Sequence, residues 1–413
     1  MTFTKIYDNG LKLVVEKMEG LYSVSIGVMV GTGSANETKK ENGISHFIEH
    51  TMFKGTQKRS AFEISDHIDR IGASINAYTS KEITCYYTKS TAEHAFETIE
   101  ILSDIFFNSV FDKKELEKEK GVIIEEINMC EDTPEDILFD LLAETRFGSE
   151  GLGQTILGPA SNIKRFSRQD VMDYMDKYYT ADNVVISIAG NVDIEQTEKM
   201  VEEYFASKFT RLKSASQVKC DKLFNGNNYK YKKIEQAHIG ISLPAFSIID
   251  DRQEALNIAN GVFGGGMSSR LFQTIREQLG LAYSVYSYGS VYKDQGVWEI
   301  CAGVNPSSRD MTAKKIIEEL EKFKDNGITE QEFLRTKEQI KSSFIMARES
   351  TVSQMMVFGK HLLCFGQAFD VDEKLRKYES LTLNDVNEVI KQVVDFDKLA
   401  IATVGPKRSK IKI

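Results

Sequence analysis

The sequence predicts an α+β fold with two homologous domains, and three observations support this prediction. Short segments with the alternation typical of strands stand between long segments with helical periodicity. A polar stretch interrupts this order near the middle of the chain, and a similar order of elements then begins again. The length of 413 residues also exceeds the roughly 100–200 residues of a typical domain. We therefore expect an internal duplication.

The first half of the chain contains both kinds of pattern. Apolar and polar residues alternate in the segments expected to be strands, and apolar residues recur every three or four positions in those expected to be helices. The elements expected in chain order are strands at 11–16 and 23–31, helices at 44–53 and 61–71, a strand pair within 74–89, helices at 91–107 and 113–130, a helix that begins near Thr133, and a strand at 184–191.

The second half repeats this order after a polar segment. Residues 213–228 show no periodicity, as expected for a linker, and would separate an N-terminal domain at 1–212 from a C-terminal domain at 229–413. The elements expected after the linker are a strand at 237–243, helices at 251–262 and 268–277, strands at 283–288 and 297–303, helices at 311–323 and 330–347, and a strand at 399–404.

The composition argues against several functional classes. The chain has 52 basic and 61 acidic residues, and this net charge of −9 argues against a nucleic-acid partner. No apolar run approaches the roughly 18 residues of a membrane-spanning helix, and the first residues contain no apolar signal region. The five cysteines are scattered without a Cys-x-x-Cys pair, which predicts neither a disulfide framework nor a thiolate zinc site. We expect a cytoplasmic protein without membrane insertion.

The most informative motif is His-x-x-Glu-His at residues 46–50. Residues at i, i+3 and i+4 share one face of a helix, so His46 and His50 can present two imidazole nitrogens to one metal ion with Glu49 beside it. Neutral imidazole suits zinc, and a catalytic zinc needs a third protein ligand and an open position. This order of residues is the inverted zincin motif, called inverzincin. The motif therefore requires a third ligand elsewhere in the chain.

The predicted helix at 113–130 supplies candidates for this ligand. Glu115, Glu119 and Glu126 lie at spacings of four and seven, on one face of the helix. Glu126 lies within an apolar stretch, where an unpaired carboxylate is costly to bury. Its neighbour Glu125 lies on a different face and is expected to be solvated. A bound metal ion would offset the cost of burying Glu126.

These residues resemble the M16 (pitrilysin-type) zinc metallopeptidases, in particular the short bacterial members similar to the β-subunit of the mitochondrial processing peptidase. In that family a ligand glutamate follows the second histidine by 76 residues, which is Glu126 here, and a supporting glutamate stands seven residues earlier, at Glu119. The resemblance covers most of the chain and continues through 72–79, 152–165, 178–193, 264–272 and 276–285.

The resemblance implies a fold and a metal site. Each domain would be an α/β sandwich, a mostly antiparallel sheet with helices packed on one face. His46, His50 and Glu126 would bind one Zn²⁺ per chain. Glu49 would act as general base and then general acid, and Glu119 would hydrogen-bond a ligand histidine and orient it. The C-terminal domain has no His-x-x-Glu-His motif and would lack metal.

The resemblance also implies residues that contact the substrate. Arg276 and Tyr283 match an arginine–tyrosine pair that reaches the substrate, and the Tyr283 phenol would stabilise the oxyanion that develops on the scissile carbonyl. Asn76, Ala77 and Tyr78 match the edge strand on which the substrate peptide lies as an added strand. Strand addition recognises backbone, so broad sequence specificity is expected.

Together these features predict a zinc-dependent endopeptidase. It would hydrolyse oligopeptides or small unfolded proteins bound in extended form within a cavity between the domains. Short members of the family are typically dimers, so we expect a homodimer, or a heterodimer with a homologous chain. The alternative is a non-catalytic structural or assembly subunit of the same superfamily. Such subunits usually lose motif residues, whereas this chain has all of them.

Overall fold

The computed structural model describes residues 1–220 and 222–411, and residue 221, inside the predicted linker, lies outside the described residues. The chain divides into two compact units. Unit 1 contains Met1–Ile127, Thr155–Val218 and Ile345–Phe369, and unit 2 contains Asn128–Gln154, Lys219–Phe344 and the residues from Asp370 onward. Each unit therefore includes a segment from the other half of the sequence. No helix in the described ranges is long and apolar enough to cross a membrane.

Unit 1 is built around a sheet with strand order β1-β2-β6-β3-β5-β4. β2 and β6 are parallel, and all other neighbours are antiparallel. The strands span Thr2–Ile6 (β1), Lys12–Lys17 (β2), Ser23–Val30 (β3), Ser74–Thr79 (β4), Thr84–Thr91 (β5) and Val184–Gly190 (β6). β4 is an edge strand, because it pairs only with β5.

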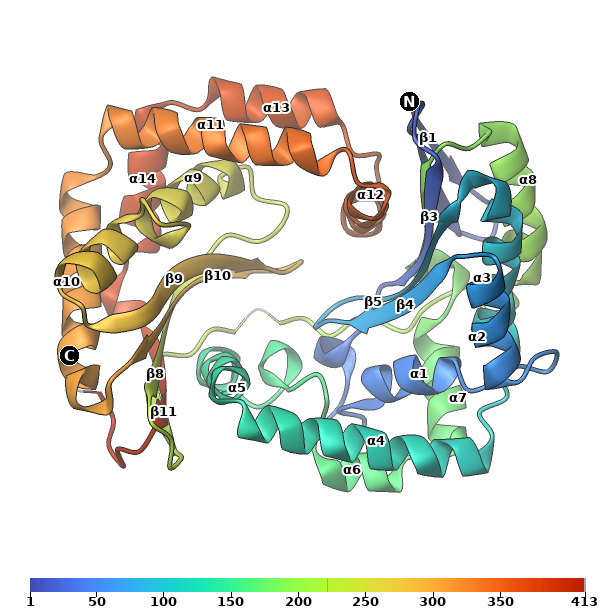
Figure 1. Cartoon of the computed structure of the whole chain (residues 1–413), viewed down its shortest axis with the longest axis horizontal. Helices are drawn as coiled ribbons and strands as arrows, with labels where there is room; N and C mark the ends of the chain where they lie inside the picture. The colour runs from blue at the N-terminus through green and yellow to red at the C-terminus, as the bar shows by residue number, and fades with distance from the viewer. Residues whose placement is uncertain (221, 412–413) are drawn as a thin grey trace. The chain divides into compact units, whose positions relative to one another are not determined.

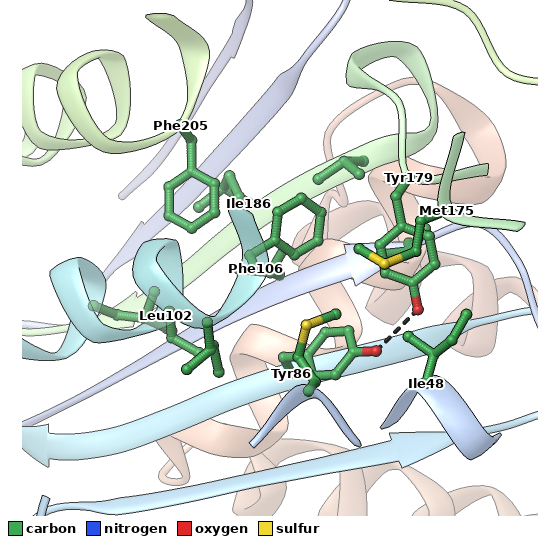
Figure 2. Packing of buried hydrophobic residues seen from close by; sticks show 14 of the residues in the cluster. Ile48, Tyr86, Leu102, Phe106, Met175, Tyr179, Ile186 and Phe205 are labelled. Carbon is green, nitrogen blue, oxygen red and sulfur yellow. Dashed lines mark hydrogen bonds between the residues drawn. The ribbon is translucent and has the colours of Figure 1, made fainter. Parts of the chain in front are cut away.

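Helices pack on one face of this sheet and form the core of unit 1. Those that contact the strands on this face are α1 (Ile44–Met52), α2 (Ala61–Arg70), α3 (Ala95–Asn108) and α8 (Ile194–Tyr204). Between α3 and α8 the chain also forms α4 (Lys113–Asp132), α6 (Ala160–Arg165) and α7 (Arg168–Tyr178). Figure 2 shows part of this core, in which the hydroxyls of Tyr86 and Tyr179 are hydrogen-bonded at 2.9 Å. Ile48 of α1 is fully buried in the same cluster, so packing fixes α1 against the sheet.

The opposite face of the sheet is covered by α12 (Thr351–Phe365), which comes from the second half of the chain (Figure 1). Oγ of Ser25 lies 2.9 Å from Oγ1 of Thr351. The approach is close because glycine stands in β3, where a Cβ atom added at Gly27 would lie 2.3 Å from Sδ of Met355. Successive residues of β3 thus contact α12 on one face and the core on the other.

Unit 2 repeats this topology with strand order β7-β11-β8-β10-β9. β7 and β11 are parallel and the other neighbours antiparallel. The strands span Gly226–Tyr231 (β7), Ala237–Ala245 (β8), Ala282–Val291 (β9), Gly296–Val304 (β10) and Ala400–Gly405 (β11). This is the sheet of unit 1 without β1. The predicted fold of two homologous domains with mostly antiparallel sheets is therefore confirmed.

The helices of unit 2 follow the same plan. The elements are α9 (Gln253–Gly264), α10 (Arg309–Asn326), α11 (Glu330–Ala347), α13 (Val371–Ser380) and α14 (Leu383–Val393), and side chains of all five contribute to or pack against one core. α5 (Pro134–Phe147), from the first half of the chain, packs on the other face, where Leu138 and Leu142 lie against Gly240 of β8. Each sheet therefore carries one helix from the other half of the sequence. The predicted boundaries at 1–212 and 229–413 differ from the two units in these exchanged helices.

Candidate metal centre

α1 places His46 and His50 one turn apart on the same face. Their ring centroids are 4.6 Å apart. The helix begins after Gly43, whose φ of 98° favours glycine. The buried carboxylate of Glu37 accepts hydrogen bonds of 2.8 Å from the backbone N–H groups of Gly43 and Ser45. Glu37 therefore satisfies N–H groups that the first turn of α1 leaves unpaired and fixes where the helix begins.

α4 brings Glu126 to the two histidines. Oε2 of Glu126 lies 3.6 Å from Nε2 of His46 and 3.5 Å from Nε2 of His50. One ligand atom from each of the three residues lies within 4.8 Å of the others. Zinc ligands at about 2.0–2.2 Å in tetrahedral geometry are roughly 3.3–3.6 Å apart. The two short separations fit the edges of such a tetrahedron.

The hydrogen-bonding state of these groups also fits a cation. Oε2 of Glu126 and Nδ1 of His46 are buried, and neither has a hydrogen-bond partner among the described residues. A carboxylate oxygen buried without a donor is costly unless a cation compensates it. Burial, and secondarily the charge of His50, lower the pKa of His46 to about 3. His46 is therefore neutral at physiological pH, the form that binds zinc.

Glu119 lies two turns before Glu126 on α4 and contacts the other side of His50. Oε2 of Glu119 is 3.3 Å from Nδ1 of His50, and Oε1 is 2.8 Å from Nζ of Lys54. Glu119 is only 6% exposed. The third acidic candidate, Glu115, forms an ion pair with Lys118 instead, and Glu125 is exposed.

Glu49 stands on α1 between the two histidines and is partly buried. Its Oε2 accepts a hydrogen bond of 2.5 Å from Oγ1 of Thr79, the last residue of β4. Burial raises the pKa of Glu49, while the Thr79 hydrogen bond and His50 oppose this rise. A half-buried carboxylate with a raised pKa, held beside a candidate metal site, suits a general base.

β4 also carries the three residues expected to contact substrate backbone. Asn76 is exposed, whereas Ala77 and Tyr78 are partly buried. The backbone N–H of Ala77 donates to Oδ1 of Asn76 at 2.8 Å. The Ser80 N–H donates to the Ile83 carbonyl where β4 turns into β5, and because hydrogen-bonded and non-hydrogen-bonded pairs alternate from there along the antiparallel strands, Ala77 occupies a non-hydrogen-bonded position. This N–H therefore faces the open edge of the sheet, where an added strand can pair.

Arg276 and Tyr283 are brought together within unit 2. Arg276 lies in a π-helical segment, Phe272–Gln278, which occupies part of the helix expected at 268–277. Its guanidinium stands 5.7 Å from the ring centroid of Tyr283 on β9. Tyr283 is 76% exposed, so its phenol is accessible to a ligand.

Known proteins resemble both halves of the chain. The family described as "Insulinase (Peptidase family M16)" matches residues 12–160, and the family described as "Peptidase M16 inactive domain" matches residues 165–340. A Bacillus subtilis protein named as an uncharacterized zinc protease is 43% identical over 399 residues, which cover 96% of this chain and 97% of that protein. The chain belongs to peptidase family M16.

Other relatives of this M16 chain agree with the assignment. A Streptomyces coelicolor protein, also named as an uncharacterized zinc protease, is 34% identical over 97% of this chain and 89% of its own length. The crystal structure of a protease from Helicobacter pylori covers 98% of this chain and 99% of its own, with a TM-score of 0.89 and 21% identity. A structure from Pseudomonas fluorescens described as a peptidase M16 inactive domain covers 100% of this chain and 99% of its own, with a TM-score of 0.91 and 18% identity. At these identities the two structures support the fold alone.

Two contacts of the M16 site involve residues that the sequence did not single out. Lys54 binds Glu119, and Thr79 binds Glu49. Lys54 lies two residues beyond Met52, the last residue of α1, so helical spacing does not place it, and its contact with Glu119 depends on how α4 lies beside the end of α1. No local signal relates Thr79 to Glu49, because this contact depends on how β4 packs beside α1.

Proposed function

We propose that this M16 protein is a zinc-dependent endopeptidase that hydrolyses oligopeptides or small unfolded proteins bound in extended form. The observation that carries the proposal is the position of Glu126 Oε2, which is buried, lacks a hydrogen-bond donor among the described residues, and lies 3.5–3.6 Å from two imidazole nitrogens. The relatives named as zinc proteases support the same metal.

The chain supplies the ligands and a base. His46, His50 and Glu126 would hold one zinc ion. Zinc, when bound, supplies a Lewis acid that lowers the pKa of a coordinated water toward about 7. Glu49 would take a proton from the attacking water and pass it to the leaving amine, because its carboxylate stands on the same helix between the ligands. Thr79 would hold that carboxylate in place.

The substrate would bind as an extended strand. β4 is an edge strand, and the Ala77 N–H faces its open side. A peptide that paired there would displace the Asn76 side chain from this N–H and gain backbone hydrogen bonds that do not depend on its sequence. The accessible Arg276 guanidinium and Tyr283 phenol would bind peptide carbonyls and the developing oxyanion.

Zinc content and peptide cleavage, measured on the same preparations, test this function. We expect about one zinc per chain and cleavage of a peptide library read by mass spectrometry, with both abolished by chelation. Glu49→Gln should keep zinc and lose roughly 10²–10⁴ in rate. Exposed Glu125→Gln on α4 is the matched control and should change neither.

Two outcomes would contradict the proposal. Full activity of Glu49→Gln would remove Glu49 from the reaction. Zinc-loaded wild-type protein that cleaves no peptide in the library would favour the non-catalytic subunit.

We also propose a cytoplasmic homodimer, or a heterodimer with a homologous chain. Light scattering on the purified protein and cell fractionation measure these two properties.

A further inference from the structure

We propose that Lys54 is a positioning residue of the metal centre, which acts through Glu119 to fix the orientation of His50. This inference rests on the proposed zinc site. The three side chains form a continuous chain of contacts. Nζ of Lys54 is 2.8 Å from Oε1 of Glu119, whose Oε2 is 3.3 Å from Nδ1 of His50.

Hydrogen-bond chemistry decides which nitrogen of His50 faces the metal. An ionised carboxylate can only accept hydrogen bonds, so the partner nitrogen, Nδ1, carries the proton. In a neutral imidazole the other nitrogen, Nε2, then holds the free lone pair. Nε2 is the atom that lies 3.5 Å from Glu126. Glu119 therefore selects the tautomer of His50 that can bind zinc.

Lys54 is needed because Glu119 is buried. Glu119 is 6% exposed, and Lys54 is its cationic partner within the described structure. Without the ammonium group, the buried carboxylate would keep the contact to His50 but lose its ion-pair partner, and removing one partner of a buried ion pair is strongly destabilising. Hydration would then stabilise a Glu119 side chain that turned toward water, and the His50 ring would lose the hydrogen-bond acceptor that holds it.

The backbone on both sides of Lys54 is fixed, which suits a positioning role. On one side, Lys54 follows the last turn of α1, and its N–H donates to the Thr51 carbonyl. On the other side, Gly55 has a φ of 117°, and its carbonyl accepts from the N–H of Val110 at 3.1 Å. Lys54 therefore reaches Glu119 from a rigid turn.

The affinity for Zn²⁺, measured by competition with a chromophoric chelator, tests this role. Lys54→Met keeps the length of the apolar stem but removes the charge, and should weaken zinc binding by roughly 10–100-fold, the usual effect of losing a group that orients a metal ligand. Lys54→Arg should restore the affinity to within a few-fold. Lys58→Met is the matched control, since Lys58 is 61% exposed on the same connection and pairs with Glu100, away from the metal centre.

A double-mutant cycle separates this role from a merely structural one. If Lys54 acts through Glu119, then Lys54→Met should weaken zinc binding little further in a Glu119→Gln background. Additive losses, or a Lys54→Met protein with wild-type zinc affinity, would overturn the inference. If Lys54→Met does not fold, Lys54→Gln replaces it in the same cycle. Failure of the wild-type protein to bind zinc would instead refute the proposed function, so the two failures are distinguishable.

Discussion

Replacement of Met355 by alanine tests whether α12 stabilises the unit that carries the metal centre. Met355 is fully buried, and its Sδ packs against Gly27 of β3. Truncation of a buried methionine to alanine costs about 2–5 kcal/mol. A domain of 150–250 residues loses about 2–4 °C in Tm for each kcal/mol. We therefore expect Met355→Ala to lower the Tm of unit 1 by roughly 4–20 °C.

Scanning calorimetry with and without zinc is the assay, because zinc stabilises the unit that binds it. Met355→Ala should lower the zinc-sensitive transition even though Met355 is distant in sequence from His46, His50 and Glu126. Met346→Ala is the control, since Met346 is 62% exposed and its truncation should change stability little. A zinc-sensitive transition that is unchanged in Met355→Ala would refute the packing of α12 on this unit.

Three further predictions concern the site residues. Because the pKa of His46 is lowered to about 3 from 6.5, the unfolded chain binds an extra proton as pH falls between these values, and the metal-free protein should lose stability over that window. His46→Gln should flatten this dependence of Tm on pH, and an unchanged slope would show that His46 is not the group whose lowered pKa causes it. Thr79→Val removes a hydrogen bond that lowers the pKa of Glu49. The acidic limb of the kcat/KM profile should therefore move to higher pH at unchanged zinc content. A limb that stays in place would show that Thr79 does not tune the general base. Tyr283→Phe should reduce kcat by about 10²–10³ without loss of zinc, and unaltered turnover would leave Tyr283 without a catalytic part.

Local patterns were sufficient to predict the helices that carry the metal centre. The helix expected at 44–53 is α1, Ile44–Met52, and the one expected at 113–130 is α4, Lys113–Asp132. Helical spacing then places His46 beside His50, and Glu119 on the same face as Glu126. These relations depend only on neighbours along one helix, which is why the sequence was informative.

Contacts between distant segments were not predictable in the same way. Periodicity shows which side of a helix is apolar, but it does not show which sheet that side covers, so the exchange of α5 and α12 was missed. A weak signal existed, because glycine is disfavoured inside strands and helices and marks close approach. A Cβ atom added at Gly359 of α12 would lie 2.7 Å from Sδ of Met29 in β3. Gly27 of β3 and Gly359 of α12 therefore each leave room for a methionine side chain of the facing element.

The position of the bound metal tests the central claim most directly. Crystals of the zinc-loaded protein, measured at the zinc absorption edge, would give an anomalous difference map that locates zinc independently of any assumption about its ligands. We predict one peak per chain within about 2.0–2.2 Å of Nε2 of His46, Nε2 of His50 and a carboxylate oxygen of Glu126. A peak bound by other residues, or zinc that remains at full occupancy in Glu126→Gln, would contradict this assignment.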